Sequence, residues 1–247
     1  MHSTRYIVMF VLAMTTIVSL ALAGLSSFWA PLHKKNELLY AKKATLSAVA
    51  DHLDMDFSTI KEDQVLSIFQ DQVEQKVLDM NGNELSKEDV EALGYKGGQA
   101  ENVDVTKEMK KDEADRVLPL FVYTKKDGSK YYILSAAGKG LWDVIWGCVA
   151  LEDDLKTIAG VSFDHKAETP GLGAEIKDNK AWVAQFAGKK IYDESGTYTS
   201  VYVRKGGAKD MNYEVDGISG ATITANGVSE MLNRGLKYYE PYLSGIK

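Results

Sequence analysis

The chain opens with a long, uninterrupted run of apolar residues. Residues 6–29 contain no charged side chain and consist mostly of Val, Leu, Ile, Ala, Met and Phe. A helix of this length crosses the roughly 30 Å hydrocarbon layer of a bilayer, and Tyr6 and Trp29 stand at its ends, where aromatic side chains suit the interface. A signal peptide cleaved after Ala21-Leu22-Ala23 is the alternative, but its apolar region would be shorter. The pattern predicts an uncleaved transmembrane anchor over residues 1–32.

Two stretches after the anchor place apolar residues three and four positions apart, which is the spacing of one helix face. The first covers residues 36–53 and has lysines between its apolar positions, so we expect an amphipathic helix that leaves the membrane. The second covers residues 61–78 and predicts another helix. Residues 81–115 are rich in Gly, Glu and Lys instead, which predicts a polar surface insertion with short elements at most.

Alternating apolar positions begin at residue 118 and predict β-strands. Residues 118–124 and 131–136 flank an Asp127-Gly128 pair, and Asp-Gly between alternating apolar runs is a strong hairpin signal. Residues 144–151 and 157–163 flank an acidic turn and predict a second hairpin.

The last third of the chain combines short elements with one long helix. A short helix is expected over residues 181–186, and a strand pair over residues 190–203. A C-terminal helix is predicted by apolar residues at spacings of three and four, namely Val228, Met231, Leu232, Leu236 and Tyr239. Antiparallel hairpins combined with helices give an α+β fold. We therefore predict one transmembrane helix followed by a single soluble domain over residues 33–247.

Small polar residues and glycines directly precede the C-terminal helix. The segment reads Asp216-Gly217-Ile218-Ser219-Gly220-Ala221-Thr222. It brings a threonine hydroxyl, two glycines and unpaired backbone N–H groups to a helix N-terminus, where a phosphate is held favourably. Serine and threonine are also common N-cap residues, so a cap without any ligand is the alternative.

The same segment resembles the covalent flavin attachment site of the FMN-binding domain family. That family's pattern is Asp, two variable residues, Ser or Thr, and then Gly-Ala-Thr. Five residues fit it: Asp216, Ser219, Gly220, Ala221 and Thr222. The resemblance implies that FMN is joined through its phosphate to the side-chain oxygen of Thr222.

Three further blocks extend the resemblance over most of the chain. They are Gly138–Trp142, Glu168–Gly173 and Val203–Ala208. In this order, and behind one apolar segment, the blocks are similar to those of the C subunits of the sodium-translocating NADH:quinone reductases. The G subunit of the Rnf-type ferredoxin:NAD electron-transport complex shares the flavin motif and is the related alternative. The chain length and Gly140-Leu141-Trp142 favour the quinone reductase.

The resemblance implies an electron-transfer subunit that carries one covalent FMN and is not catalytically complete alone. The other subunits of its membrane complex would take part in oxidising NADH, reducing quinone and exporting sodium. Membrane lipid and a flavin transferase, which delivers FMN from FAD with AMP leaving, are the other implied partners. A different class of function is a membrane-tethered module that holds FMN without redox work, or holds no flavin.

Several residues are expected to hold the flavin phosphate once it is esterified. The expected donors are the backbone N–H groups of Gly220 and Ala221 and the hydroxyls of Ser219 and Thr224. Lys205 would place an ammonium group near the phosphate or the ring, or else is a solvated turn lysine.

Asp216 has two interpretations. It either assists attachment, by recognition or by accepting the threonine proton, or satisfies local N–H groups in a turn.

The ring has its own expected contacts. Glu168 and Thr169 would hydrogen-bond its edge, while Leu172 would offer an apolar surface and Gly173 would permit close approach. Without the resemblance these residues are an ordinary Pro-Gly turn. Trp142 would shield the ring or belong to the core.

Charge and composition argue against a nucleic-acid partner, an intrachain disulfide and a metal site. The net charge of −6 argues against nucleic acid as a partner, because phosphate backbones are bound through clustered Lys and Arg. A single cysteine, Cys148, excludes an intrachain disulfide and is expected to be a buried small hydrophobe. The four histidines are scattered with no Glu or Cys at ligand spacing, which supports no metal site.

Charges around the anchor and the family resemblance disagree about orientation. Arg5 precedes the apolar run, whereas Lys34, Lys35, Lys42 and Lys43 follow it. The positive-inside rule would therefore place the bulk of the protein in the cytoplasm. The resemblance implies a bacterial inner membrane with the soluble domain facing the periplasm or outside, where the flavin transferase also works in many bacteria. We follow the resemblance.

Overall fold

The computed structural model describes residues 3–246. Met1, His2 and Lys247 fall outside this range, so the first two residues of the predicted anchor and one of the four histidines are not described. The chain divides into two compact units, at residues 1–40 and 41–247.

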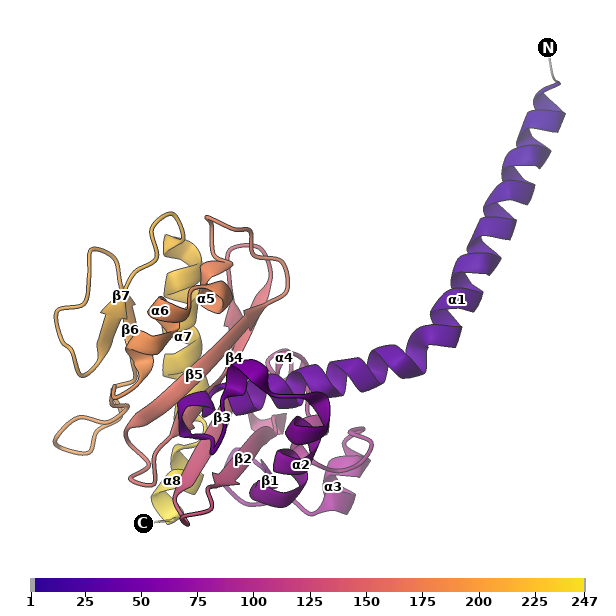
Figure 1. Cartoon of the computed structure of the whole chain (residues 1–247). Helices are drawn as coiled ribbons and strands as arrows, with labels where there is room; N and C mark the ends of the chain where they lie inside the picture. The colour runs from indigo at the N-terminus through magenta and orange to yellow at the C-terminus, as the bar shows by residue number, and fades with distance from the viewer. Residues whose placement is uncertain (1–2, 247) are drawn as a thin grey trace. The chain divides into compact units, whose positions relative to one another are not determined.

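The apolar N-terminal run forms helix α1, which extends over Thr4–Ser47 and includes Pro31 (Figure 1). The helix is long and apolar enough to cross a membrane. It also corrects the prediction of a separate amphipathic helix over residues 36–53, because α1 continues through that stretch and ends at Ser47. Residues 32–47 contain neither glycine nor proline and are mostly good helix formers, so nothing in the sequence interrupts the helix. Two 3₁₀ helices follow, η1 over Ala50–His52 and η2 over Phe57–Thr59.

The second unit is built on a five-stranded antiparallel sheet in the order β1-β2-β3-β4-β5 (Figure 1). Its strands are β1 Val73–Leu78, β2 Leu118–Thr124, β3 Lys130–Lys139, β4 Val144–Leu151 and β5 Ile158–His165. The two predicted hairpins are confirmed, as β2–β3 and β4–β5.

Strand β1 corrects the prediction of one helix over residues 61–78. Helix α2 covers only Glu62–Gln72, and the chain then becomes a strand in which Val73 pairs with Tyr123 of β2. Val73 and Val77 are both buried. A spacing of four fits one face of a strand as well as one face of a helix, and β-branched residues favour the strand.

The connection from β1 to β2 contains four short helices, which are α3 Lys87–Ala92, η3 Ala100–Asn102, α4 Val105–Glu108 and η4 Glu113–Asp115. Buried Glu108 fastens this connection to the domain. Its carboxylate accepts a 2.8 Å hydrogen bond from the N–H of Val117 and forms a 2.7 Å ion pair with Lys111.

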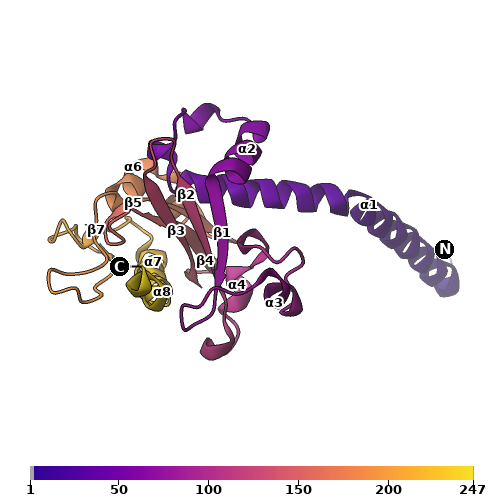
Figure 2. The ribbon, with the colours of Figure 1, turned by 90° about the horizontal axis from the view of Figure 1, so that it is seen from below.

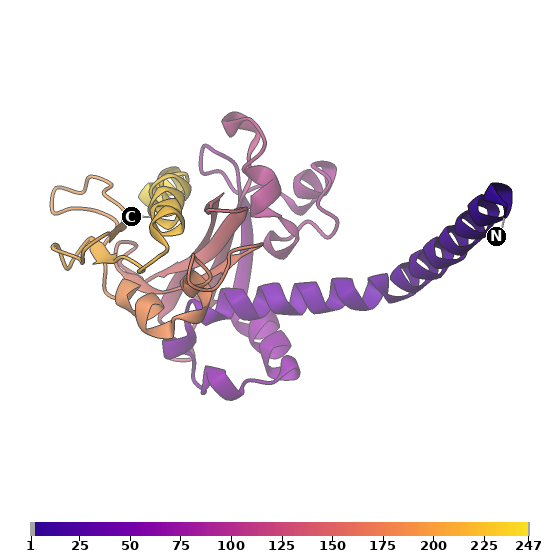
Figure 3. The ribbon, with the colours of Figure 1, turned by 90° about the horizontal axis from the view of Figure 1, so that it is seen from above.

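Helix α7, over Thr222–Lys237, covers one face of the sheet, and residues 41–47 of α1 together with α2 lie on the other face (Figures 2 and 3). The apolar stripe predicted for this helix is buried at Val228, Met231, Leu232 and Leu236. On the opposite face, the Ser162 hydroxyl donates to the Ala44 carbonyl at 2.8 Å. The sheet therefore holds the start of α7 in a fixed place relative to β3.

Short elements complete the domain. Those next to β5 are α5 Glu175–Asp178, α6 Lys180–Val183 and η5 Ala184–Phe186. Strand β6 Tyr202–Arg204 lies against α7 and pairs with β7 Glu214–Asp216, while α8 Glu240–Gly245 approaches Gly82 after β1. The strand pair predicted near residues 190–203 is reduced to an isolated antiparallel bridge between Tyr192 and Tyr198, while Lys190 bridges to Thr157 and β6 begins at Tyr202. Strand β6 instead pairs in parallel with β7.

Candidate functional site

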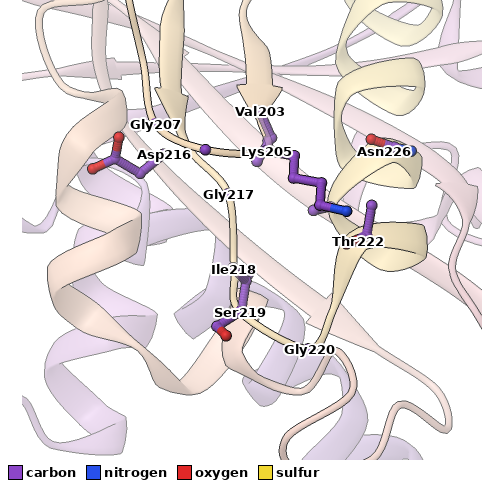
Figure 4. A pocket seen from close by; sticks show the side chains of 12 residues that line it. Val203, Lys205, Gly207, Asp216, Gly217, Ile218, Ser219, Gly220, Thr222 and Asn226 are labelled. Atoms are coloured by element: carbon purple, nitrogen blue, oxygen red, sulfur yellow. The ribbon is translucent and has the colours of Figure 1, made fainter.

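An open pocket of about 520 Å³ lies where the β6–β7 pair meets the start of α7 (Figure 4). Five of the residues predicted for the site line it: Lys205, Asp216, Ser219, Gly220 and Thr222. The structure therefore brings together two blocks that are separate in the sequence, Val203–Ala208 and Asp216–Thr222.

Thr222 is the first residue of α7, and its side chain is exposed on the pocket wall. The N-cap residue is Ala221, which supplies no side-chain hydrogen bond to the helix. The capping alternative for Ser219 and Thr222 is thus not realised, and within the described part of the chain the first N–H groups of the helix have no side-chain cap. Such a helix start carries a partial positive charge and free donors.

The loop before Thr222 lies against the 168–173 loop. Gly220 has a φ of +80°, and a Cβ at this position would stand 2.5 Å from the carbonyl oxygen of Gly171. Only glycine fits such a close approach in a left-handed conformation. The contact fixes how the start of α7 meets the neighbouring loop.

Glu168 joins the remaining blocks through a buried carboxylate that is only 6% exposed. It accepts hydrogen bonds from the N–H groups of Trp142 at 2.9 Å and Leu141 at 3.3 Å, and from the Thr224 hydroxyl at 2.6 Å. Burial raises the pKa of Glu168, but the hydrogen bonds from Thr224 and from the backbone around Trp142 outweigh it and lower that pKa. We call Glu168, Leu141, Trp142 and Thr224 the Glu168 cluster.

The Glu168 cluster shows where two residues expected at the flavin lie. Glu168 and the Thr224 hydroxyl bind each other inside the protein, whereas the resemblance implies contacts with the ring edge and the phosphate. Thr224 also donates to the Leu172 carbonyl at 3.3 Å. Both residues hold the pocket in place rather than lining it.

The other residues expected at the ring lie outside the pocket lining, and three of them, Trp142, Thr169 and Leu172, are exposed. Trp142 is 62% exposed and Leu172 is 41% exposed, so the alternative of a core tryptophan is wrong. Thr169 is exposed, and its carbonyl accepts from the N–H of Leu172 at 3.0 Å. Gly173 is buried.

Lys205 projects into the pocket on the side of Thr222 (Figure 4). It is exposed, and within residues 3–246 it forms no ion pair. Its ammonium group is therefore available to an anion near the helix start.

Asn226 also lines the pocket and was not among the residues predicted from the sequence. It lies four residues after Thr222 on α7, and residues at this spacing share one helix face. This spacing could have identified Asn226 from the sequence, because a residue one helical turn after Thr222 lies beside it.

Two other predictions concern residues away from the pocket. Cys148 is half-buried on β4, with its sulfur 3.7 Å from the Ser135 hydroxyl oxygen, and burial raises the pKa of its thiol. In the part of the chain that the structure describes, no group of three or more His, Cys, Asp or Glu side chains could hold a metal ion.

Comparisons with known proteins agree on one kind of relative. Residues 140–237 match the model of the FMN-binding domain family. The C subunit of the Na(+)-translocating NADH-quinone reductase of Neisseria meningitidis serogroup A is 32% identical over 249 residues, covering 96% of this chain and 92% of that protein. The corresponding protein of Vibrio vulnificus strain YJ016 is 38% identical over 130 residues, or 51% of each chain.

Two solved structures are similar to this chain over most of its length. The C subunit of the same reductase from Parabacteroides distasonis superposes with a TM-score of 0.71 at 32% identity, covering 86% of this chain and 96% of that one. The NqrC of Shewanella oneidensis superposes with a TM-score of 0.67 at 25% identity, covering 85% of this chain and 99% of that one.

The buried hydrogen bond from Thr224 to Glu168 is expected to stabilise the domain. Thr224→Val should lower the free energy of unfolding by about 2 kcal/mol, because a buried carboxylate loses a donor, whereas Thr224→Ser keeps the hydroxyl and most of the stability. Chemical denaturation of the full chain in detergent measures both.

Thr157→Val is the matched control for that experiment. It removes a hydroxyl-to-carboxylate hydrogen bond of the same 2.6 Å length at the surface, to Asp154, where water can replace it. This control should change the free energy of unfolding by no more than about 0.5 kcal/mol. Equal stability of the Val and Ser variants at position 224 would contradict the role given to the Glu168 cluster.

Proposed function

Since this chain belongs to the family of C subunits of the Na(+)-translocating NADH-quinone reductase, we propose that it carries one FMN covalently on Thr222 and transfers electrons. It would do so as one subunit of a membrane complex that oxidises NADH, reduces quinone and exports sodium. The complete reaction requires the other subunits. FMN supplies the redox chemistry, because its ring accepts one or two electrons.

The exposed hydroxyl of Thr222 at the start of α7 is the observation that carries this proposal. A phosphate ester formed there would keep one negative charge beside the free N–H groups of the helix start, which favours it. Lys205 lies on the same pocket wall and adds a positive charge. The residues present therefore fit a flavin phosphate.

The size and surroundings of the pocket support a cofactor of this kind. A volume of about 520 Å³ is in the range of small-molecule sites. The exposed apolar side chains of Trp142 and Leu172 offer surface to a flat ring beyond the pocket. The carboxylate of Glu168, by contrast, is occupied inside the protein and adds no accessible negative charge next to the phosphate.

Attachment needs a partner, because threonine is a weak nucleophile at its ordinary pKa. We assign this work to a flavin transferase that uses FAD as the donor. The new bond joins the Thr222 oxygen to the phosphorus of the FMN half, the bond between the two phosphates breaks, AMP leaves, and the hydroxyl proton is released to the transferase or to solvent. This chain contributes an accessible acceptor hydroxyl and the donors that receive the phosphate.

The relatives favour the quinone reductase over the other candidate functions. Relatives that match 96% of this chain are named as the C subunit of that reductase, not as the G subunit of an Rnf-type complex. A tethered module without redox work would yield colourless protein, or a flavin whose reduction leaves the activity of the complex unchanged.

Replacing the acceptor tests the proposal. The full chain made together with a flavin transferase should fluoresce under ultraviolet light on a denaturing gel, and Thr222→Ala should abolish that fluorescence. Thr197→Ala, in an exposed turn away from the pocket, is the control and should fluoresce like the parent. Fluorescence that persists in Thr222→Ala would contradict the proposal. Thr224 is then a poor alternative acceptor, because it is fully buried.

We further propose that α1 is a single-pass anchor in lipid and that the soluble domain faces the periplasm or outside of a bacterial inner membrane. Protease added to intact spheroplasts should then digest the domain, while a cytoplasmic control protein stays protected. If the domain is protected until the membrane is opened, it faces the cytoplasm, as the positive-inside rule predicts, and the proposed orientation is wrong.

A further inference from the structure

The polar wall of the pocket is a tight turn that follows β6. The N–H of Gly207 donates to the Arg204 carbonyl at 3.2 Å, which closes a four-residue turn. Gly206, the third residue of that turn, has a φ of +88°, as a type II turn requires. Lys205 occupies the second position, so the turn sets the direction in which its side chain leaves the backbone.

Asp216 holds this turn from the neighbouring strand. Its Oδ1 accepts a 2.8 Å hydrogen bond from the N–H of Ala208, the residue after the turn. The Arg204 carbonyl also accepts a hydrogen bond from the N–H of Gly217 at 2.8 Å. The same carbonyl therefore binds both the turn and the loop that leads to Thr222. A single carboxylate thus ties the Lys205 turn to the strand that leads into the acceptor loop.

The backbone of Asp216 is fixed as firmly as its side chain. Its N–H donates to the Gln185 side-chain oxygen at 2.9 Å, and its carbonyl accepts from the Trp182 indole N–H at 2.6 Å. In Figure 4 the carboxylate lies on the far side of the pocket from Thr222 and points away from it. A carboxylate in this position has no direct path to the threonine proton.

Glu214, two residues earlier on β7, fastens the other end of the same loop. It accepts from the N–H groups of Lys209 at 2.8 Å and Asp210 at 3.1 Å, and pairs with Arg204 at 2.6 Å. These N–H groups and Arg204 lower the pKa of Glu214 to about 2. The side-chain carboxylates of Asp216 and Glu214, both on β7, therefore accept hydrogen bonds from the backbone N–H groups of residues 208–210, in the loop that begins with Lys205.

We propose that Asp216 is a positioning residue for flavin attachment, which holds Lys205 beside Thr222 through the N–H of Ala208, and that it does not accept the threonine proton. This inference rests on the proposed attachment of FMN to Thr222. It resolves the two interpretations that the sequence allows for this aspartate. Position 216 then needs a side-chain oxygen that accepts the hydrogen bond from Ala208, and it does not need a negative charge.

Two substitutions separate these requirements. Asparagine keeps an oxygen that can accept from Ala208 but has no basic carboxylate, whereas alanine removes both. The full chain is co-produced with a flavin transferase, and the initial rate of covalent flavin fluorescence is measured against pH. Asp216→Asn should stay within about threefold of the parent with the same pH profile. Asp216→Ala should be slower by on the order of tenfold, as for the loss of one charge-assisted hydrogen bond.

A matched control and a second readout keep the inference separate from the proposed function. Asp193→Ala removes a carboxylate that accepts from the N–H groups of Ser195 and Thr197 in an exposed turn, and it should attach flavin at the parental rate. Hydrogen–deuterium exchange at the Ala208 amide should be faster in Asp216→Ala than in Asp216→Asn. This measurement needs no flavin.

The outcomes that overturn the inference are distinct. If Asp216→Asn attaches flavin as slowly as Asp216→Ala, the carboxylate acts as a base or a charge. If Asp216→Ala matches the parent, the position of the turn is unimportant. If the parent itself acquires no flavin, the proposed function fails, and equal exchange at Ala208 in the two variants would then overturn the positioning role as well.

Discussion

The buried carboxylate of Glu168 is the constraint on which the site depends. A charged group that is 6% exposed must keep its hydrogen-bond donors, and these come from the Leu141–Trp142 loop and from Thr224 on α7. Three segments far apart in the sequence are thereby fixed around one point. Thr222 precedes Thr224 by two residues, so the same carboxylate that buries one threonine leaves the other at the surface at the start of the helix.

The charges around the pocket are arranged to suit a phosphate. Asp216, which lines the pocket, and Glu214 on the same strand accept hydrogen bonds from the backbone N–H groups of Ala208 and Lys209. The helix start and Lys205 remain free to meet an anion. A chain with a net charge of −6 can therefore bind one phosphate ester, because local geometry and not overall charge decides the potential at the site.

The sequence predicted those parts of the fold whose signals are local. The hairpins β2–β3 and β4–β5 follow from alternating residues around turns such as Asp127-Gly128, and α7 follows from its apolar spacing. The helix predicted through Val73 and Val77 was wrong because a spacing of four suits both a helix and a strand, and only pairing with β2 decides between them. The roles of Glu168 and Thr224 were missed for a similar reason, since the motif identifies the segments but tertiary contacts decide where each side chain points.

The exposed hydroxyl of Thr222 at the start of α7 is the proposed site of the covalent FMN. Peptide mass spectrometry on the protein purified from its native membranes tests this most directly, using the tryptic peptide of residues 210–234. The account predicts that this peptide carries the mass of FMN less one water and that fragmentation places the addition on Thr222. An unmodified peptide from membranes with an active complex, or an addition located on Ser219 or Thr224, would contradict it.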